Sequence, residues 1–128
     1  MKKTFFLLVI VAAAALFMHG CAAKDETVAH GDMVGETTTI TKGDFYEACD
    51  KWTPGETVNY SFTSSKPVMF NVHYHDEHAK VYAVEQTLAD KLEGSFVVVS
   101  DAIHCCMWEN KNPNNVTLTF AMSVAENK

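Results

Sequence analysis

Three histidines stand close together near the middle of the chain, in the segment His73-Tyr74-His75-Asp76-Glu77-His78. The alternating pattern of residues 68–75 predicts a β-strand, in which His73 and His75 point to one face. Two imidazoles on one strand face lie close enough to bind a single metal ion, and His78 follows just past the strand end. His73, His75 and His78 are therefore candidate ligands for copper or zinc.

Sulfur-containing side chains extend this candidate metal site. Met69 is expected on the same strand face as the two histidines, and Cys106 and Met107 belong to a later strand. Met and Cys suit copper(I), whereas His and carboxylate suit copper(II) or zinc. The alternative interpretation is structural: strand faces often carry polar residues, and methionines usually fill gaps in a core.

Motifs of catalysis are missing from the sequence. It contains no Gly-x-Ser-x-Gly elbow, no His-Glu-x-x-His pair, no glycine-rich phosphate loop and no Cys-x-x-Cys. His104 and Cys105 do not form a dyad, because neighbouring residues on a strand point to opposite faces. We expect a protein that is not an enzyme.

Short β-strands must position these residues. The predicted strands cover residues 37–41, 45–52, 58–63, 68–75, 81–86, 94–99, 103–109 and 116–123. Residues 64–67 are expected to form a turn, residues 87–91 a loop or helical turn, and the apolar run 94–99 a central strand. Seven to eight short strands without a long helix predict an all-β fold, an antiparallel β-sandwich over residues 37–128.

The chain begins like an exported protein. Lys2 and Lys3 precede an apolar run from Phe5 to Met18, which has the length of a secretory signal and is short for a membrane span. The run ends at Met18-His19-Gly20-Cys21, which resembles a bacterial lipobox. The alternative is an ordinary cleaved signal with an incidental cysteine.

The lipobox resemblance implies that Cys21 becomes the first residue of the mature chain and carries a lipid, palmitate included. Residues 1–20 are then the lipoprotein signal peptide, and residues 21–36 form a lipidated, flexible tether. Ala22 follows the cysteine, and a non-acidic residue there usually accompanies sorting to the periplasmic face of the outer membrane. We expect a lipid-anchored protein of the cell envelope.

The charge of the chain restricts its partners. Once residues 1–20 are removed, eight Lys oppose sixteen Asp and Glu, a formal net charge of −8, and there is no Arg. An acidic chain without Arg is a poor candidate for binding nucleic acid. Attachment to the membrane should come from acyl chains rather than from a basic surface.

Cys49, Cys105 and Cys106 remain once Cys21 is assigned to the lipid. Exported compartments are oxidising, so two of the three are expected to pair. Cys105 and Cys106 are poor partners for each other, because adjacent strand residues point to opposite faces. The bridge therefore joins Cys49 to Cys105 or to Cys106, and one thiol stays free.

Three segments carry a resemblance to a known fold family: 55–62 (GETVNYSF), 64–75 (SSKPVMFNVHYH) and 105–110 (CCMWEN). Together they are similar to GOLD-type, emp24-like β-sandwich domains and their bacterial exported relatives, over roughly residues 45–124. The resemblance implies a disulfide between Cys49 and Cys105, because this family pairs an early with a late cysteine. Cys106 departs from the family, which has a hydrophobic residue there.

The resemblance also implies protein or ligand binding without a common catalytic apparatus. Two functions are therefore expected from the sequence. The first is a lipid-anchored, non-enzymatic binding module that contacts another envelope component, with an envelope protein as the expected partner. The second is a periplasmic lipoprotein that binds copper or zinc through the three histidines and nearby Met and Cys.

Overall fold

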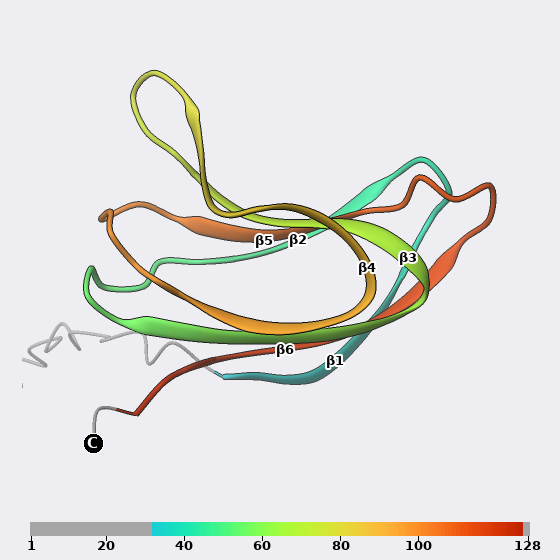
Figure 1. The fold of residues 1–128 in the computed structure, drawn as a ribbon, viewed down its shortest axis with the longest axis horizontal. Coiled ribbons are helices and arrows are strands. Elements are labelled where there is room, and N and C mark those ends of the chain that lie inside the picture. Colours follow the sequence, from blue (N-terminus) through green and yellow to red (C-terminus); the bar gives the residue numbers. More distant parts are fainter. Residues whose placement is uncertain (1–31, 127–128) are drawn as a thin grey trace, which may run out of the picture.

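The computed structural model describes residues 32–126, which form six β-strands and no helix (Figure 1). The strands are β1 (Met33–Ile40), β2 (Phe45–Asp50), β3 (Thr57–His75), β4 (Lys80–Val97), β5 (His104–Glu109) and β6 (Val116–Val124). All their pairings are antiparallel. The predicted all-β antiparallel sandwich is confirmed. Within residues 32–126, no helix has the length and apolarity needed to cross a membrane.

Two long strands, β3 and β4, form one hairpin that serves both layers of the sandwich. The first half of β3 pairs with β6, and its second half pairs with β5. β4 pairs with β3 along both halves. One layer therefore contains β1, β6 and one half of the hairpin, and the other contains β2, β5 and the other half. Figure 1 shows the two layers edge-on, joined where β3 and β4 bend together.

This bend replaces two features expected from the sequence. Residues 64–67 do not form a separate turn, and residues 87–91 are neither a loop nor a helical turn, because both stretches belong to continuous strands. The register of the pair shifts between Thr63 and Val68, where the strands bend without separating. An irregularity of this kind bends a strand without ending it. Six strands therefore take the place of the seven to eight predicted.

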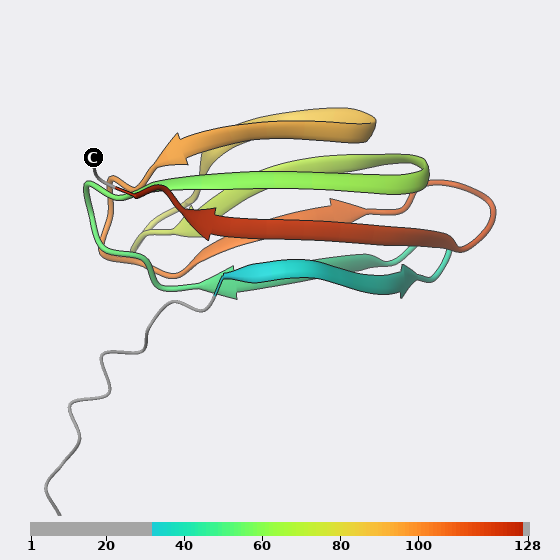
Figure 2. The same cartoon turned by 90° about the horizontal axis from the view of Figure 1, so that it is seen from below.

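The apolar run 94–99 is not the central strand that the sequence suggests. In the structure β4 ends at Val97 and pairs only with β3 among the described strands, so it lies at an edge (Figure 2). Phe96 and Val98 are buried in the core, whereas Val97 and Val99 are 54% and 70% exposed. The run thus supplies one apolar face to the core and one to the surface.

The first strand begins earlier than the predicted tether allows. β1 starts at Met33, so residues 33–36 belong to the folded domain rather than to a tether that ends at residue 36. Met33 pairs with Met122 and packs against the core, and the register shifts between Met33 and Glu36. Gly35 lies in this irregularity with φ of 64°, a conformation that glycine adopts without strain. The signal peptide and Cys21 lie outside the described residues.

The core is built around the side chain of Trp108. It is 1% exposed, and its ring lies 4.8 Å from that of Phe120 and 5.5 Å from that of Phe70. Phe62 and Tyr46 complete the surrounding aromatic contacts. These residues come from both layers, so aromatic packing of this kind holds the layers together.

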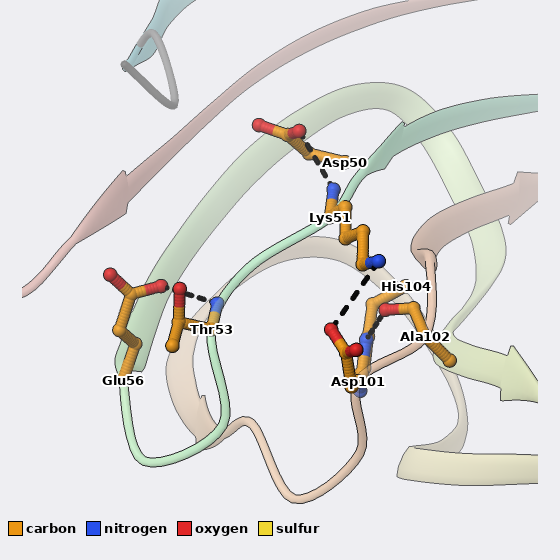
Figure 3. Close-up of polar contacts among 7 residues, drawn as sticks. All are labelled: Asp50, Lys51, Thr53, Glu56, Asp101, Ala102 and His104. Carbon is orange, nitrogen blue, oxygen red and sulfur yellow. Dashed lines mark hydrogen bonds and ion pairs between the residues drawn. The ribbon is translucent and has the colours of Figure 1, made fainter. Parts of the chain in front are cut away.

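Two loops close one end of the sandwich (Figure 3). Backbone hydrogen bonds of 2.8 Å join Gly55 and Glu56 of the β2–β3 loop to Val98. Lys51 forms an ion pair of 3.4 Å with Asp101. Behind these loops the buried His104 ring contacts Tyr74, Phe96 and Trp52, while its Nδ1 lies 2.8 Å from the carbonyl oxygen of Ala102. His104 and Trp52 are therefore packing residues of the core.

The disulfide joins Cys49 to Cys105, as the family resemblance implies. The two residues face each other in the register of β2 and β5, on the side of that layer that points away from the core. Cys106 points into the core and is a free, fully buried cysteine. The alternative bridge from Cys49 to Cys106 is therefore excluded by strand alternation.

Removal of this disulfide should lower the stability of the domain. Because the bridge spans a sequence separation of 56 residues, the chain-entropy treatment gives a loss of about 4 kcal/mol for the double variant Cys49→Ala/Cys105→Ala. Guanidinium denaturation followed by circular dichroism measures this loss. Reduction of the disulfide in the unmodified chain should lower the free energy of unfolding by a similar amount, and the guanidinium midpoint should fall accordingly. Unchanged midpoints in both cases would contradict the expectation.

Candidate functional site

The predicted metal ligands of β3 lie on the outer face of the β2–β5 layer. His73 and His75 share this face, as the alternation predicts, and their ring centroids are 5.2 Å apart. His75 is exposed, but His73 is only 2% exposed, and the neighbouring Asn71 is equally buried. This face is therefore not the exposed polar surface that the structural alternative assumed.

The strand register brings other groups to the same place. Glu47 of β2, Met107 of β5 and Asn71 of β3 lie in one row across the layer. The next row contains the disulfide and His73, since His73 faces Cys105. We call Glu47, Asn71 and His73 the Glu47–His73 cluster.

The His73 ring has a defined neighbour at each nitrogen. Its Nδ1 lies 2.8 Å from Oδ1 of Asn71, and its Nε2 lies 3.5 Å from Oε1 of Glu47. Burial lowers the pKa of the His73 imidazole below its usual value. The nearby Lys80 and His75 lower this pKa further, while Glu47 opposes them.

Two predicted ligands lie away from the Glu47–His73 cluster. Cys106 lies on the opposite, core-facing side of β5, where its Sγ is 3.0 Å from Sδ of Met122. It cannot share a metal ion with His73, and its inclusion in the ligand set was wrong, because a strand places successive side chains on opposite faces. His78 lies on the β3–β4 turn, exposed beside Glu77.

Met69 and Met107 stay on the correct face but in different positions. Met107 faces Asn71 and Glu47 across the strands, whereas Met69 faces Glu109, one row further from His73. Glu47 was not among the sequence candidates. Its position two residues before Cys49 could have indicated it, because residues 47 and 49 of a strand share one face. The disulfide to Cys105, which faces His73, brings that face of β2 close to the histidine.

Acidic and sulfur groups also meet beside the cluster. The Glu47 carboxylate and the sulfurs of Cys49 and Cys105 lie within 4.8 Å of one another. Both sulfurs belong to the disulfide, so neither is a thiolate available to a metal. In the oxidised protein Glu47 is thus the one metal-binding group of these three.

A second feature lies on the other outer face, over β1, β6 and the adjoining halves of β3 and β4. Two adjoining hollows of about 430 and 260 Å³ share Ser61, Glu93 and Ala121 in their lining. Ser61 faces both Ala121 of β6 and Glu93 of β4. We call the two hollows together the β1–β6 groove.

Side-chain size explains why the β1–β6 groove exists. Ser61 and Ala121 are small and point away from the core, since their neighbours Phe62 and Phe120 are buried in it. Longer side chains border the hollows, namely those of Val34, Lys91 and Glu93. The lining combines apolar residues with Ser, Thr and Asn side chains, and it contains no His or Cys. It offers hydrogen bonds to a ligand but no histidine base or thiol nucleophile.

Comparison with known proteins supports the fold. No family model and no curated protein matches the chain. Among solved structures, it is similar to Aeromonas hydrophila PliG, a periplasmic lysozyme inhibitor of g-type lysozyme, with a TM-score of 0.55 and 14% identity over 74% of this chain and 85% of that chain. It is also similar to the Yersinia pseudotuberculosis-derived mitogen, with a TM-score of 0.57 and 11% identity over 77% and 89% of the two chains.

At these identities the likeness concerns the fold alone. It agrees with the β-sandwich seen in the structure, and it gives no support for membership of the GOLD-type family, which stays a prediction.

The free cysteine should be unreactive in the folded protein. Burial raises the pKa of the Cys106 thiol to about 12, and the side chain has no exposed surface. In a chain carrying Cys21→Ser, iodoacetamide at pH 8 is expected to modify no cysteine under native conditions and one after denaturation. Mass spectrometry counts the adducts. Adding Cys106→Ala should abolish the label on the denatured chain, and rapid labelling of the folded protein would refute the expectation.

Proposed function

We propose that this protein is a lipid-anchored, non-enzymatic binding module of the bacterial cell envelope that holds an extended segment of another envelope protein in the β1–β6 groove. The observation that carries the proposal is the groove itself, an open hollow floored by Ser61 and Ala121, with apolar residues and Ser, Thr and Asn side chains in its lining. Hydroxyl and amide groups can both donate and accept hydrogen bonds, which suits a peptide backbone.

The composition of the groove favours a protein over a charged polymer. Lys91 and Glu93 lie on the same border, so the groove has no strong field of one sign. Three aromatic residues contribute to the lining, but the rings of Phe62 and Phe120 are buried in the core and the Tyr60 ring packs on Phe70 at 5.0 Å. A surface of mixed polar and apolar side chains is typical of non-obligate protein interfaces.

The position of the first strand supports a lipid at Cys21. β1 begins nearer the end of the sandwich that carries the loops 51–56 and 98–103, since Met33 faces Met122, which in turn faces Tyr60 close to the start of β3. In the sequence, eleven residues lie between Cys21 and Met33. With the lipid in the bilayer, this end faces the membrane and the β1–β6 groove faces sideways, open to a neighbouring protein.

Site-specific photocrosslinking in cells tests the binding groove. With p-benzoylphenylalanine at the exposed Glu93 on the border of the groove, we expect a discrete adduct with a protein, whereas the same group at the exposed Glu85 on the other half of β4 should give none of that mass. Adding Ala121→Trp should remove the adduct, because indole fills the floor of the groove.

A matched control for the filling variant is Thr87→Trp, which adds the same ring at an exposed position away from the groove. It should leave the Glu93 adduct unchanged. The proposed groove function fails if Glu93 and Glu85 give the same adducts, or if Ala121→Trp has no more effect than Thr87→Trp.

Metabolic labelling tests the anchor separately. The natural chain should incorporate labelled palmitate and fractionate with the outer membrane, and Cys21→Ser should lose both properties. Cys106→Ala serves as the control, since a buried thiol should not accept a lipid. Equal labelling of the natural chain and Cys21→Ser would rule out the anchor and leave the groove proposal to its own test.

A further inference from the structure

We infer that the Glu47–His73 cluster is a binding site for a divalent transition cation, zinc or copper(II), with Glu47 Oε1 and His73 Nε2 as its first two ligands. This site is on the opposite outer face from the β1–β6 groove and does not depend on the function proposed for the groove. The metals are those expected from the sequence, but the ligands differ from the set predicted there.

The first argument is the hydrogen bonding of the His73 ring. Oδ1 of Asn71 is an acceptor, so the 2.8 Å contact requires the hydrogen of the neutral ring to be on Nδ1. Nε2 then carries a lone pair. This lone pair faces a carboxylate oxygen of Glu47 at 3.5 Å, also an acceptor. Two acceptors directed at each other repel unless a cation lies between them.

The second argument is the distance. Zinc binds histidine nitrogen at about 2.0–2.1 Å and carboxylate oxygen at about 2.0–2.2 Å. At a tetrahedral angle these bond lengths separate the nitrogen and oxygen by about 3.4 Å. The observed 3.5 Å therefore matches a bridged pair and is long for a direct hydrogen bond.

The third argument is the support around the two ligands. A hydrogen bond from the second nitrogen of a histidine ligand to an oxygen acceptor is the usual arrangement in metal sites, and Asn71 provides it here. The disulfide next to Glu47 fixes β2 against β5. The site is therefore held in position by buried and covalently joined groups before a cation arrives.

Access and further ligands come from the solvent side. The Glu47 side chain is 32% exposed, so one side of the pair is open to water. His75 is exposed on the same face, and rotation of its side chain can bring a third ligand to the ion. Imidazole and carboxylate ligands favour zinc or copper(II) over copper(I).

One nearby charge opposes the cation. Lys80 lowers the pKa of His73. The Nζ of Lys80 lies 5.9 Å from the centre of the ring of Tyr82, the residue of β4 that faces His73. Its positive charge repels an incoming ion. Lys80→Gln should therefore tighten binding, whereas removal of a ligand should weaken it.

Competition of the full, detergent-solubilised chain with a chromophoric chelator tests the site, using zinc and copper(II) in separate titrations. Glu47→Gln and His73→Gln are each expected to raise the dissociation constant at least about 100-fold, and Asn71→Leu by about 10–100-fold as a positioning residue. Lys80→Gln should lower it. His78→Ala is the matched control, because this exposed histidine lies outside the cluster and its loss should change nothing.

Nitrogen chemical shifts of the His73 ring give a readout that survives if the His73 variant fails to fold. In the metal-free chain we expect the hydrogen on Nδ1, and on addition of zinc a shift of Nε2 but not of Nδ1. A hydrogen on Nε2 that donates to Glu47 would overturn the inference. So would unchanged affinity in a folded Glu47→Gln variant, or a loss in His78→Ala as large as that in Glu47→Gln, which would indicate adventitious binding to surface histidines only.

Discussion

The bend that β3 and β4 make together near Thr63 and Val68 determines where every other strand lies. A straight strand of 19 residues would extend about 60 Å, far beyond the usual strand of 5–6 residues. The bend folds the hairpin onto itself. β4 occupies one edge of β3, and the other edge pairs with β6 in the first half of β3 and with β5 in the second. The apolar side chains of both halves then face each other, and Trp108 fills the space between them.

Local patterns predicted which residues are in strands but not how strands are joined. The alternation of Val58 with Asn59, or of Val116 with Thr117, is a local property and gave the correct faces. Ser64-Ser65-Lys66-Pro67 carries every local signal of a turn, yet it lies within β3. The flanking residues Thr63 and Val68 pair with β4 and continue the strand on either side, and that pairing is a tertiary property that no short window of sequence contains.

The candidate sites were also predictable only as far as local patterns determine them. Strand alternation correctly predicted that His73 and His75 share one face. The family resemblance correctly predicted that Cys49 pairs with Cys105. Strand alternation could not show that His73 and Asn71 are buried on a face that points away from the core. Their burial results from neighbours on other strands, such as Glu47 at 3.5 Å and the ring of Tyr82 at 6.5 Å. The β1–β6 groove was missed because small residues such as Ala121 give no chemical signal on their own.

The two outer faces can work independently because a rigid core separates them. Ser61 and His73 lie on different halves of β3, in different layers, with the aromatic residues around Trp108 and the Cys106–Met122 contact between the layers. A close-packed interior of this kind changes shape little when a ligand binds at the surface. Occupation of either face should therefore add its own binding free energy to the stability of the same folded state.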